Sequence, residues 1–237
     1  MPLDTLDATL VSVHSVTPRV KQFLLRVEGH PFDFTPGQHV SVAVGGGEEG
    51  PEYRPYSPVS QPGTDTIALA VKRYPEGTGS VWMHERTVGD SISFTPPSGN
   101  LGLRALDRDV VFLATGTGLT PMLSMVTKYL MEGEGHATLL FGERTEADLM
   151  YRETLDLYAA SHPNFTVRYV LSEEDWSGPT GYVQEHLAAF LDDPDAPHVY
   201  VCGVPEMVVE TKGVLFDLGV PDDHLFTEGW EEGAIAE

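Results

Sequence analysis

The spacing of the hydrophobic residues changes near residue 105, and this change divides the chain of 237 residues into two parts. Before it, short runs rich in β-branched and aromatic residues alternate with turns that contain Gly and Pro. After it, apolar strands alternate with segments of helical spacing. The first pattern favours an antiparallel barrel and the second a parallel sheet. The sequence therefore predicts a two-domain protein, with an antiparallel β-barrel over residues 1–104 and a Rossmann-like α/β domain over residues 105–237. The boundary is expected between Leu101 and Asp109.

The expected elements follow from these patterns. In the first part we expect the strands Ala8–His14, Gln22–Val27, His39–Val44, Tyr53–Val59 and Thr66–Arg73, and a short helix at Ser80–Arg86. In the second part we expect strands at Val110–Ala114, Ala137–Phe141, Phe165–Leu171 and His198–Val201 and around Phe226. Helices are expected between them at Pro121–Met131, Ala147–Ala159, Val183–Leu191 and Glu206–Leu218.

The chain is strongly acidic, with 36 Asp and Glu against 14 Lys and Arg and a formal net charge of −22. Such a surface repels nucleic acid and anionic lipid, so we expect neither as a partner. Many carboxylates with few lysines are also typical of proteins from organisms that live in very high salt. We favour this halophilic interpretation over that of an ordinary acidic cytosolic protein.

Cysteine content and the N-terminus limit the setting in which the protein works. Cys202 is the only cysteine, which excludes an internal disulfide and an iron–sulfur cluster held by four cysteines of this chain. No apolar run reaches the roughly 18 residues needed to cross a bilayer. The segment Met1–Asp7 is acidic and lacks the basic start of a signal peptide. We therefore expect a cytoplasmic protein without a membrane partner.

The segment Arg54-Pro55-Tyr56-Ser57 is the first candidate binding site. On a strand, Arg54 and Tyr56 share one face and Ser57 lies on the other. Arg54 can hold a phosphate with two hydrogen bonds while the Tyr56 ring lies against an aromatic cofactor. Ser57 can offer a hydrogen-bond donor to a ring nitrogen. An ordinary strand with a surface arginine and a packed tyrosine is the alternative.

Two glycine-rich segments each precede a predicted helix. Gly77-Thr78-Gly79-Ser80 exposes backbone N–H groups that can bind an anion, although a plain turn with Ser80 as N-cap is the alternative. Gly116-Thr117-Gly118-Leu119-Thr120-Pro121 directly follows the first strand of the α/β domain. Its glycines allow a pyrophosphate to approach the backbone, and Thr120 and Pro121 suit the N-cap and first helical positions. This second segment predicts a dinucleotide-binding site.

A further pair, Cys202-Gly203, lies where a later parallel strand ends. Ligands of open α/β sheets bind at this edge. An inert core cysteine is the alternative.

Taken in order, these segments resemble the ferredoxin–NADP reductase family of flavoenzymes, and the resemblance covers nearly the whole chain. Pro36-Gly37-Gln38, Phe141-Gly142-Glu143-Arg144 and Glu228-Gly229-Trp230 also fall in the family order. The resemblance implies an enzyme that transfers a hydride from NAD(P)H to the N5 atom of bound FAD and passes electrons singly to a separate carrier. FMN would share the Arg-x-Tyr-Ser element, so the choice of FAD rests on the family.

The resemblance also implies a role for each matching residue. The flavin site would comprise Arg54, Pro55, Tyr56, Ser57, Gly77, Gly79, Ser80 and Trp230. The nucleotide site would comprise Gly116, Thr117, Gly118, Thr120, Pro121, Arg144, Ser172, Cys202 and Gly203. Ser57, Cys202 and Glu228 would be the catalytic residues, because they would border the reacting atoms. Trp230 would shield the flavin face. No metal is expected.

The sequence constrains the choice of nucleotide and of electron acceptor less strongly than it constrains the fold. Family members that prefer NADP carry a basic residue after the serine that ends the third strand, whereas Ser172 is followed here by Glu173-Glu174, which favours NADH. The acceptor is expected to be a separate carrier such as a ferredoxin, a flavodoxin or an oxygenase component, and free flavin is an alternative acceptor. A regulatory or electron-transfer subunit without turnover of its own is the alternative function, and a nucleotide-binding protein without flavin is a third.

Overall fold

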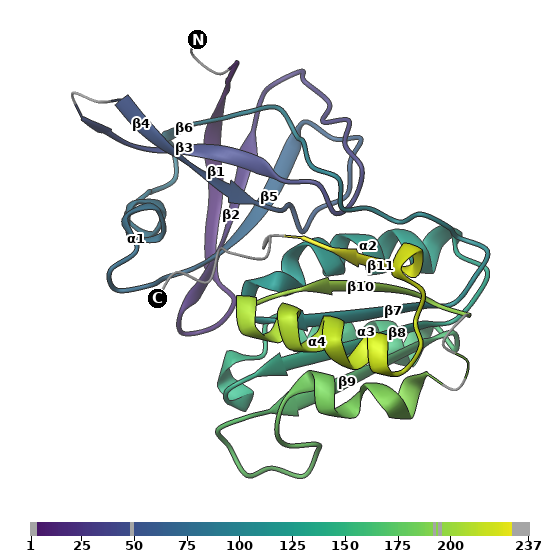
Figure 1. The fold of residues 1–237 in the computed structure, drawn as a ribbon. Coiled ribbons are helices and arrows are strands. Elements are labelled where there is room, and N and C mark those ends of the chain that lie inside the picture. The colour runs from purple at the N-terminus through teal and green to yellow at the C-terminus, as the bar shows by residue number, and fades with distance from the viewer. Residues whose placement is uncertain (1–3, 48–49, 192, 194–195, 229–237) are drawn as a thin grey trace. The chain divides into compact units, whose positions relative to one another are not determined.

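The chain folds into two compact units, Met1–Gly102 and Leu103–Glu237 (Figure 1). The computed structural model describes residues 4–47, 50–191, 193 and 196–228. The first unit is all-β apart from one short helix, and the second alternates strands with helices. The fold class expected from the sequence is confirmed.

The first unit is a six-stranded antiparallel sheet in the order β4-β3-β6-β1-β2-β5. Its elements are β1 (Leu6–Ser15), β2 (Val20–Arg26), β3 (Val40–Gly47), β4 (Gly50–Tyr56), β5 (Thr66–Lys72), α1 (Thr78–His84) and β6 (Ser91–Phe94). An antiparallel bridge between Pro58 and Leu69 joins the segment after β4 to β5 at the other end of this order. The sheet thereby closes on itself as a barrel.

Alternating burial along the strands builds the barrel core. In β1, Ala8 and Leu10 are buried, and in β2, Phe23 and Leu25 are buried while their neighbours are at least partly exposed. These side chains join Phe32 and other apolar residues in one cluster. The period of two that predicted strands here is therefore the period of inward-facing residues.

The second unit is a five-stranded parallel sheet in the order β11-β10-β7-β8-β9. Its strands are β7 (Val110–Thr115), β8 (Ala137–Glu143), β9 (Phe165–Leu171), β10 (His198–Cys202) and β11 (Leu225–Thr227). Its helices are α2 (Leu119–Glu132), α3 (Arg152–Ser161) and α4 (Pro205–Asp217), with 3-10 turns at Gly116–Gly118, Glu146–Asp148, Val183–Phe190 and Asp222–His224.

Helical segments cover both faces of this sheet, which explains the continuous apolar runs of its central strands (Figure 1). Val111 and Leu113 of β7 pack with Met207 and Leu215 of α4 on one face. The alternate β7 residues point to the opposite face, where α2 packs. The carboxyl ends of the strands consequently form one edge at which the connecting loops gather.

Three expectations about elements need correction. The four-residue strand β6 was not expected. The helix expected over Ala147–Ala159 is split, because Tyr151 has left-handed backbone with φ 54° and separates a 3-10 turn from α3. The segment expected as a helix from Val183 is a 3-10 helix that ends at Phe190.

A histidine pair lies at the start of β10 and β11. The ring centroids of His198 and His224 are 5.0 Å apart, and Arg108 Nη1 lies 3.0 Å from His224 Nε2. The Nδ1 atoms of both rings are buried and have no hydrogen-bond partner among the residues that the structure describes. Burial lowers the pKa of His198, and the nearby charge of Arg108 lowers it further. The pair therefore favours a neutral His198 in the folded state.

Mild acid is expected to destabilise the protein through His198. Because the folded pKa is lowered, the unfolded chain binds the proton first, so the stabilisation is present above pH 6.5 and is lost as the pH falls below it. His198→Gln should flatten the fall in melting temperature between pH 7.5 and 5.5 by roughly 2 °C. Thermal melts followed by circular dichroism test this. His14→Gln, which replaces an exposed histidine, should leave the slope as it is; an equal effect of both variants would disprove the assignment.

Candidate functional site

Arg54 lies on β4 beside a carboxylate. Glu52 Oε2 is 2.5 Å from Arg54 Nη2 and 3.4 Å from the hydroxyl of Thr78, the first residue of α1. One negatively charged oxygen thus accepts hydrogen bonds both from the strand arginine and from the helix start. A phosphate oxygen carries the same charge and accepts the same donors, so this donor set fits the phosphate of a flavin cofactor.

Gly79 brings the two predicted parts of the flavin site together. A Cβ atom at Gly79 would lie 2.8 Å from Arg54 Cγ and 3.5 Å from the phenol oxygen of Tyr56. The absence of a side chain lets α1 pack against β4. Burial raises the pKa of Tyr56, and the Arg54 charge offsets this in part, so Tyr56 is a neutral ring.

Ser80 is held inside the turn that precedes α1. Its hydroxyl accepts a hydrogen bond from the Tyr74 N–H at 3.1 Å and lies 3.2 Å from the Gly77 carbonyl oxygen. Gly77 is the N-cap of α1, so the alternative of Ser80 as N-cap is wrong. A phosphate at this turn would meet backbone N–H groups rather than the Ser80 hydroxyl. Pro55 lies on β4, and Ser57 directly follows it.

The loop after β7 begins with a left-handed glycine. Gly116 has φ 56°, which side-chain-bearing residues rarely adopt. A Cβ atom at Gly118 would lie 2.1 Å from the Cys202 carbonyl oxygen, so this glycine makes room for the loop after β10. The sequence suggested that a ligand approaches the backbone closely at these glycines. At Gly118, the group that approaches closely is the backbone of Cys202 and Gly203.

The start of α2 differs from expectation. Gly118 is its N-cap, and Thr120 and Pro121 are the second and third helical residues rather than N-cap and first residue. The Thr120 hydroxyl donates to the Thr117 carbonyl oxygen at 2.9 Å. Pro121 still lies in the first turn, where its missing N–H has no partner within the helix. The helix starts earlier because the 3-10 turn at Gly116–Gly118 leads directly into it.

Cys202 and Glu228 lie near each other at the carboxyl edge of β10 and β11. Burial raises the pKa of the Cys202 thiol to about 12, and the charge of Glu228 also raises it. The thiol is therefore uncharged and suits packing against a neutral ring. Gly203 approaches β7 closely, because a Cβ atom there would lie 2.2 Å from Thr115 Oγ1. The same Thr115 oxygen accepts the Val204 N–H at 3.1 Å.

Arg144 and Ser172 follow neighbouring strands of the sheet. The Ser172 N–H donates to the Glu143 carbonyl oxygen at 3.1 Å, so the two loops run side by side. Arg144 Nε lies 3.4 Å from Glu173 Oε1. Arg144 is thus paired with the first of the two glutamates that follow Ser172.

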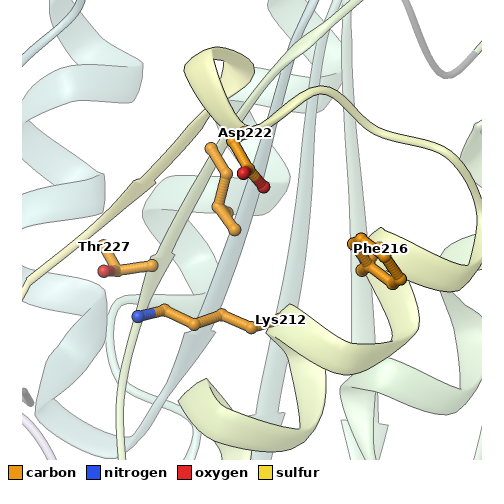
Figure 2. A pocket seen from close by; sticks show the side chains of 5 residues that line it. Lys212, Phe216, Asp222 and Thr227 are labelled. Carbon is orange, nitrogen blue, oxygen red and sulfur yellow. The ribbon is translucent and has the colours of Figure 1, made fainter. Parts of the chain in front are cut away.

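A separate open hollow of about 360 Å³ lies between α4 and β11 (Figure 2). Lys212 and Phe216 of α4 line it together with Asp222, Leu225 and Thr227. None of the predicted site residues lines it, so it takes no part in the site described above.

Not every predicted residue can be placed. Trp230 lies outside the described residues. Sequence reasoning also missed Glu52, Thr78 and Thr115, whose contacts join segments that are distant along the chain. Glu52 stands two residues before Arg54 on the same strand face, and this spacing was the available signal.

No helix within the described residues is long and apolar enough to cross a membrane. Within that same part of the chain, no three His, Cys, Asp or Glu side chains are grouped to hold a metal ion.

Comparison with known proteins identifies the class. Residues 7–102 match the family model described as "Oxidoreductase FAD-binding domain", and residues 112–212 match "Oxidoreductase NAD-binding domain". The chain is 35% identical over 246 residues to "Ferredoxin--NADP reductase B" of Sorangium cellulosum (strain So ce56), covering 95% of this chain and 97% of that protein. The fold and both sites thus define a two-domain flavin- and nicotinamide-dependent oxidoreductase.

Other relatives agree. The naphthalene 1,2-dioxygenase system ferredoxin--NAD(P)(+) reductase component of Pseudomonas putida is 30% identical over 245 residues, covering 99% of this chain and 71% of that protein. Among solved structures, the ferredoxin reductase in carbazole 1,9a-dioxygenase has a TM-score of 0.84 at 26% identity, covering 97% of this chain and 70% of that one. The chain belongs to the ferredoxin–NADP reductase family. It is an NAD(P)H-dependent flavin reductase with FAD and NAD(P)H as cofactors.

Proposed function

We propose that the protein oxidises NADH and passes electrons singly to a separate carrier protein. The observation that carries the flavin part is the anionic oxygen of Glu52 held jointly by Arg54 and Thr78. The chemistry that FAD supplies when bound is acceptance of a hydride and release of single electrons. The residues of the chain bind and orient the two cofactors.

The proposed roles follow the geometry within each unit, which we assign as flavin domain 1–104 and nucleotide domain 105–237. When the flavin is bound, Arg54 pairs with the flavin phosphate instead of with Glu52. The neutral ring of Tyr56 packs against the flavin. Pro55, Gly77, Gly79 and Ser80 complete this site through backbone groups, and Ser57 donates to the ring. In the nucleotide domain, Gly116–Pro121 bind the pyrophosphate, and Cys202, Gly203 and Glu228 border the nicotinamide. Trp230 is proposed to cover the flavin face.

Nucleotide preference is proposed to depend on Glu173. A carboxylate about 4 Å from a 2′-phosphate costs roughly 1–4 kcal/mol, and the ion pair with Glu173 occupies Arg144. Glu173→Gln should raise kcat/KM for NADPH about tenfold relative to NADH, because Arg144 is released for the 2′-phosphate. Steady-state kinetics with both nucleotides test this. Glu153→Gln removes the same charge from an exposed site on α3 and should not alter the ratio. A ratio unchanged in both variants would remove Glu173 from the specificity determinants.

The carrier is proposed to be a ferredoxin, a flavodoxin or an oxygenase component. Two relatives are named as reductases of ferredoxin or of a dioxygenase system. With a net charge of −22, association with an acidic carrier is opposed at low salt and is nearly neutral at molar salt. We place this reaction in the cytoplasm, where NADH is produced.

A halophilic origin is proposed from the same charge. Self-repulsion is screened as the Debye length falls from about 10 Å at 0.1 M to about 3 Å at 1 M salt. The melting temperature should therefore rise by on the order of 10 °C between 0.1 and 2 M KCl. Calorimetry in KCl measures this, with sucrose at equal osmolarity as the uncharged control. A melting temperature that rises equally in sucrose, or not at all in KCl, would contradict the proposal.

The visible spectrum under anaerobic conditions tests the whole function. Yellow protein purified in high salt should be bleached by NADH and, at higher concentration, by NADPH. Yellow protein that neither nucleotide bleaches would point instead to a subunit without turnover. Folded protein that takes up neither FAD nor FMN would disprove the proposal.

A further inference from the structure

We propose that the segment Leu103–Asp109 is held on the second unit by an acid-sensitive latch and that, held there, it positions the two bound cofactors for hydride transfer. The latch comprises the side chains of Arg108, His198 and His224. We call the segment the linker, because it directly follows the first unit, which ends at Gly102. The part that concerns hydride transfer rests on the proposed function, because it needs a flavin on one unit and a nicotinamide on the other.

The start of the linker is bound to a stack of three aromatic rings. The backbone N–H of Arg104 donates to the Tyr200 hydroxyl at 2.9 Å, and the Arg104 guanidinium carbon lies 5.5 Å from the ring centroid of Phe226. Tyr200 is fully buried, and its ring stacks on those of Phe112 and Phe226 with centroid distances of 5.3 and 5.1 Å. The three rings lie side by side because their residues are paired in register on β7, β10 and β11. The group that accepts the linker is therefore fixed by the sheet.

The end of the linker is held by α2, by the first residue of β10 and by the latch. The Tyr129 hydroxyl donates to the Arg108 carbonyl oxygen at 2.6 Å. The backbone N–H of His198 donates to the Asp109 carbonyl oxygen at 3.0 Å. The third contact is made by the Arg108 side chain, whose Nη1 lies 3.0 Å from His224 Nε2. Of these three contacts, only the last depends on the protonation state of a histidine ring.

The contact between Arg108 and His224 requires a neutral imidazole. A guanidinium has only N–H donors, so His224 Nε2 must be the acceptor and carries no proton. Protonation of this nitrogen would remove the lone pair that accepts the hydrogen bond and would place a second positive charge beside the guanidinium. The latch is therefore closed only while His224 is neutral.

His198 adds a second titratable ring to the latch. It is 8% exposed, its ring centroid lies 5.0 Å from that of His224, and its Nδ1 has no hydrogen-bond partner within the described part of the chain. Burial lowers the pKa of His198, and Arg108 and His224 lower it further. Asp223 and Asp107 act in the opposite direction on this pKa, and the net shift is downward. The other charged or titratable groups around the latch are Arg104, Asp109, Tyr129 and Tyr200. The strands β7 and β11, which flank β10, contribute no charged side chain.

Acid is therefore expected to release the linker from the sheet. Because the pKa of the held His198 lies below the usual value of 6.5, the released ring binds a proton first as the pH falls. The preference for the held linker is fully present above pH 6.5 and is lost below it. From this residue alone, the ratio of released to held linker should rise by up to about tenfold between pH 7.5 and 5.5.

Hydrogen exchange of single backbone amides, followed by NMR on the holoprotein in high salt, tests the latch. The N–H groups of Arg104 and Glu134 report on it, because their acceptors are the Tyr200 hydroxyl and the Leu106 carbonyl oxygen. Release of the linker separates both pairs. The protection factors of these two amides should fall several-fold, up to about tenfold, from pH 7.5 to pH 5.5.

Glutamine variants separate the latch from other effects of acid. His198→Gln with His224→Gln should show the same protection at both pH values, because a glutamine carbonyl accepts the Arg108 hydrogen bond without titrating. His14→Gln, which replaces an exposed histidine, should keep the fall of the wild type. Unchanged protection in the wild type, or an equal fall in the double glutamine variant, would overturn the latch.

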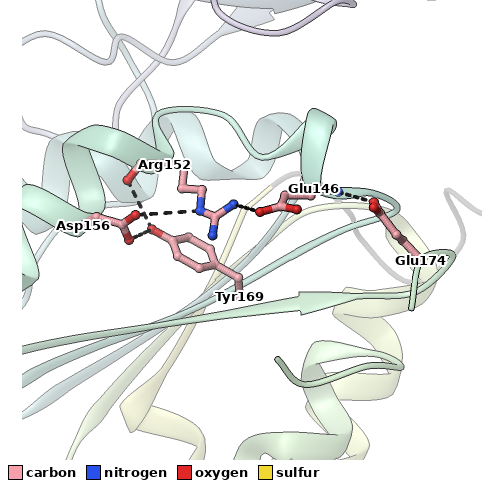
Figure 3. Close-up of polar contacts among 5 residues, drawn as sticks. All are labelled: Glu146, Arg152, Asp156, Tyr169 and Glu174. Carbon is pink, nitrogen blue, oxygen red and sulfur yellow. Dashed lines mark hydrogen bonds and ion pairs between the residues drawn. The ribbon is translucent and has the colours of Figure 1, made fainter. Parts of the chain in front are cut away.

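The network around Arg152 is an internal reference in the same spectra. Arg152 pairs with Glu146 and Asp156, and none of the residues drawn in Figure 3 is a histidine. The backbone N–H of Glu146 donates to Glu174 Oε2 at 2.7 Å. Histidine is the side chain that ordinarily titrates between pH 5 and 8, so the Glu146 amide should keep its protection factor. An equal fall at this amide would indicate general opening of the unit and would contradict a local release.

Removal of both side-chain contacts tests the effect on hydride transfer. Arg108→Met with Tyr200→Phe removes the donor to His224 and the acceptor of the Arg104 N–H, and neither residue lies in a proposed cofactor site. The rate of flavin reduction at saturating NADH should fall about tenfold, because small displacements of reacting groups have large effects on rate. The Kd of NAD⁺, measured by calorimetry, should stay the same, since the nucleotide contacts are intact.

Arg168→Met on β9 is the matched control. Arg168 is an exposed arginine whose hydrogen bond goes to the adjacent Val167 carbonyl oxygen, so this variant should be reduced as fast as the wild type. A wild-type rate in the Arg108→Met and Tyr200→Phe double variant, or a loss that arises from weaker NAD⁺ binding, would overturn the positioning role. Wild-type protein that shows the acid-dependent exchange but is not reduced by NADH would instead overturn the proposed function.

Discussion

Gly118→Ala is expected to lower kcat/KM for NADH oxidation at least about a hundredfold, because the new methyl group would clash with backbone atoms of the loop after β10. The added Cβ would lie 2.1 Å from the Cys202 carbonyl oxygen and 2.7 Å from the Gly203 Cα. Neither neighbour is the end of a flexible side chain, so one loop must move. The loops after β7 and β10 carry the proposed pyrophosphate and nicotinamide contacts, and their separation disturbs both. Stopped-flow reduction by NADH measures the loss.

Gly213→Ala is the matched control for this substitution. Gly213 lies within α4, and among the described residues no heavy atom outside its chain neighbours and the adjacent backbone of its own helix lies within 4 Å of a Cβ built there. Alanine should leave the kinetics as they are and raise stability by up to about 1 kcal/mol, since it favours the helix. The flavin content should be the same in both variants, because each change lies in the second unit. If NADH reduced the Gly118→Ala variant at the wild-type rate, the two loops would be able to move apart without loss of function. That result would contradict the prediction.

Arg54→Gln is expected to yield folded protein that loses FAD on desalting. A hydrogen bond to a charged group contributes about 1.5–3 kcal/mol, so its loss should weaken FAD binding roughly 10–150-fold. Glu52→Gln should act in the opposite direction, because it removes the carboxylate that competes for the same guanidinium. The dissociation constant of FAD, measured by titration of the apoprotein, gives both effects.

Arg26→Gln controls for the loss of a barrel arginine. Arg26 also pairs with a carboxylate, Asp65, at 3.5 Å, and both side chains are exposed. Such a pair contributes about 0–1 kcal/mol, so FAD binding should stay unchanged. Equal weakening in Arg26→Gln and Arg54→Gln would indicate general damage to the barrel, and unchanged binding in Arg54→Gln would remove it from the flavin site.

The long-range features of the fold were predictable because they depend on hydrophobic spacing. The buried runs of β7 and β8 read directly as strands of a parallel sheet. The four-residue β6 could not be found this way, because its alternation covers only Ile92 and Phe94. Residues 91–94 form a strand because they pair with β1 and β3. The local sequence does not encode this long-range pairing.

The sequence suggested candidate site segments but not the local contacts within them. The prediction of Thr120 as N-cap was wrong, because the helix start at Leu119 depended on a 3-10 turn that displaced Thr120 from that position. The different environments of Glu173 and Glu174 could not be read from two identical neighbouring residues. They follow from the packing of two loops that begin about 28 residues apart, as the contact between Glu146 and Glu174 illustrates.

The environment of Cys202 has a consequence for the lifetime of the protein. Flavin enzymes release hydrogen peroxide when reduced flavin meets oxygen, and thiols are oxidised in proportion to their thiolate form and exposure. With its pKa raised to about 12, the thiol holds almost no thiolate at physiological pH. The only cysteine of the chain is thereby held as the thiol, the less reactive form toward the oxidant that the enzyme itself would produce.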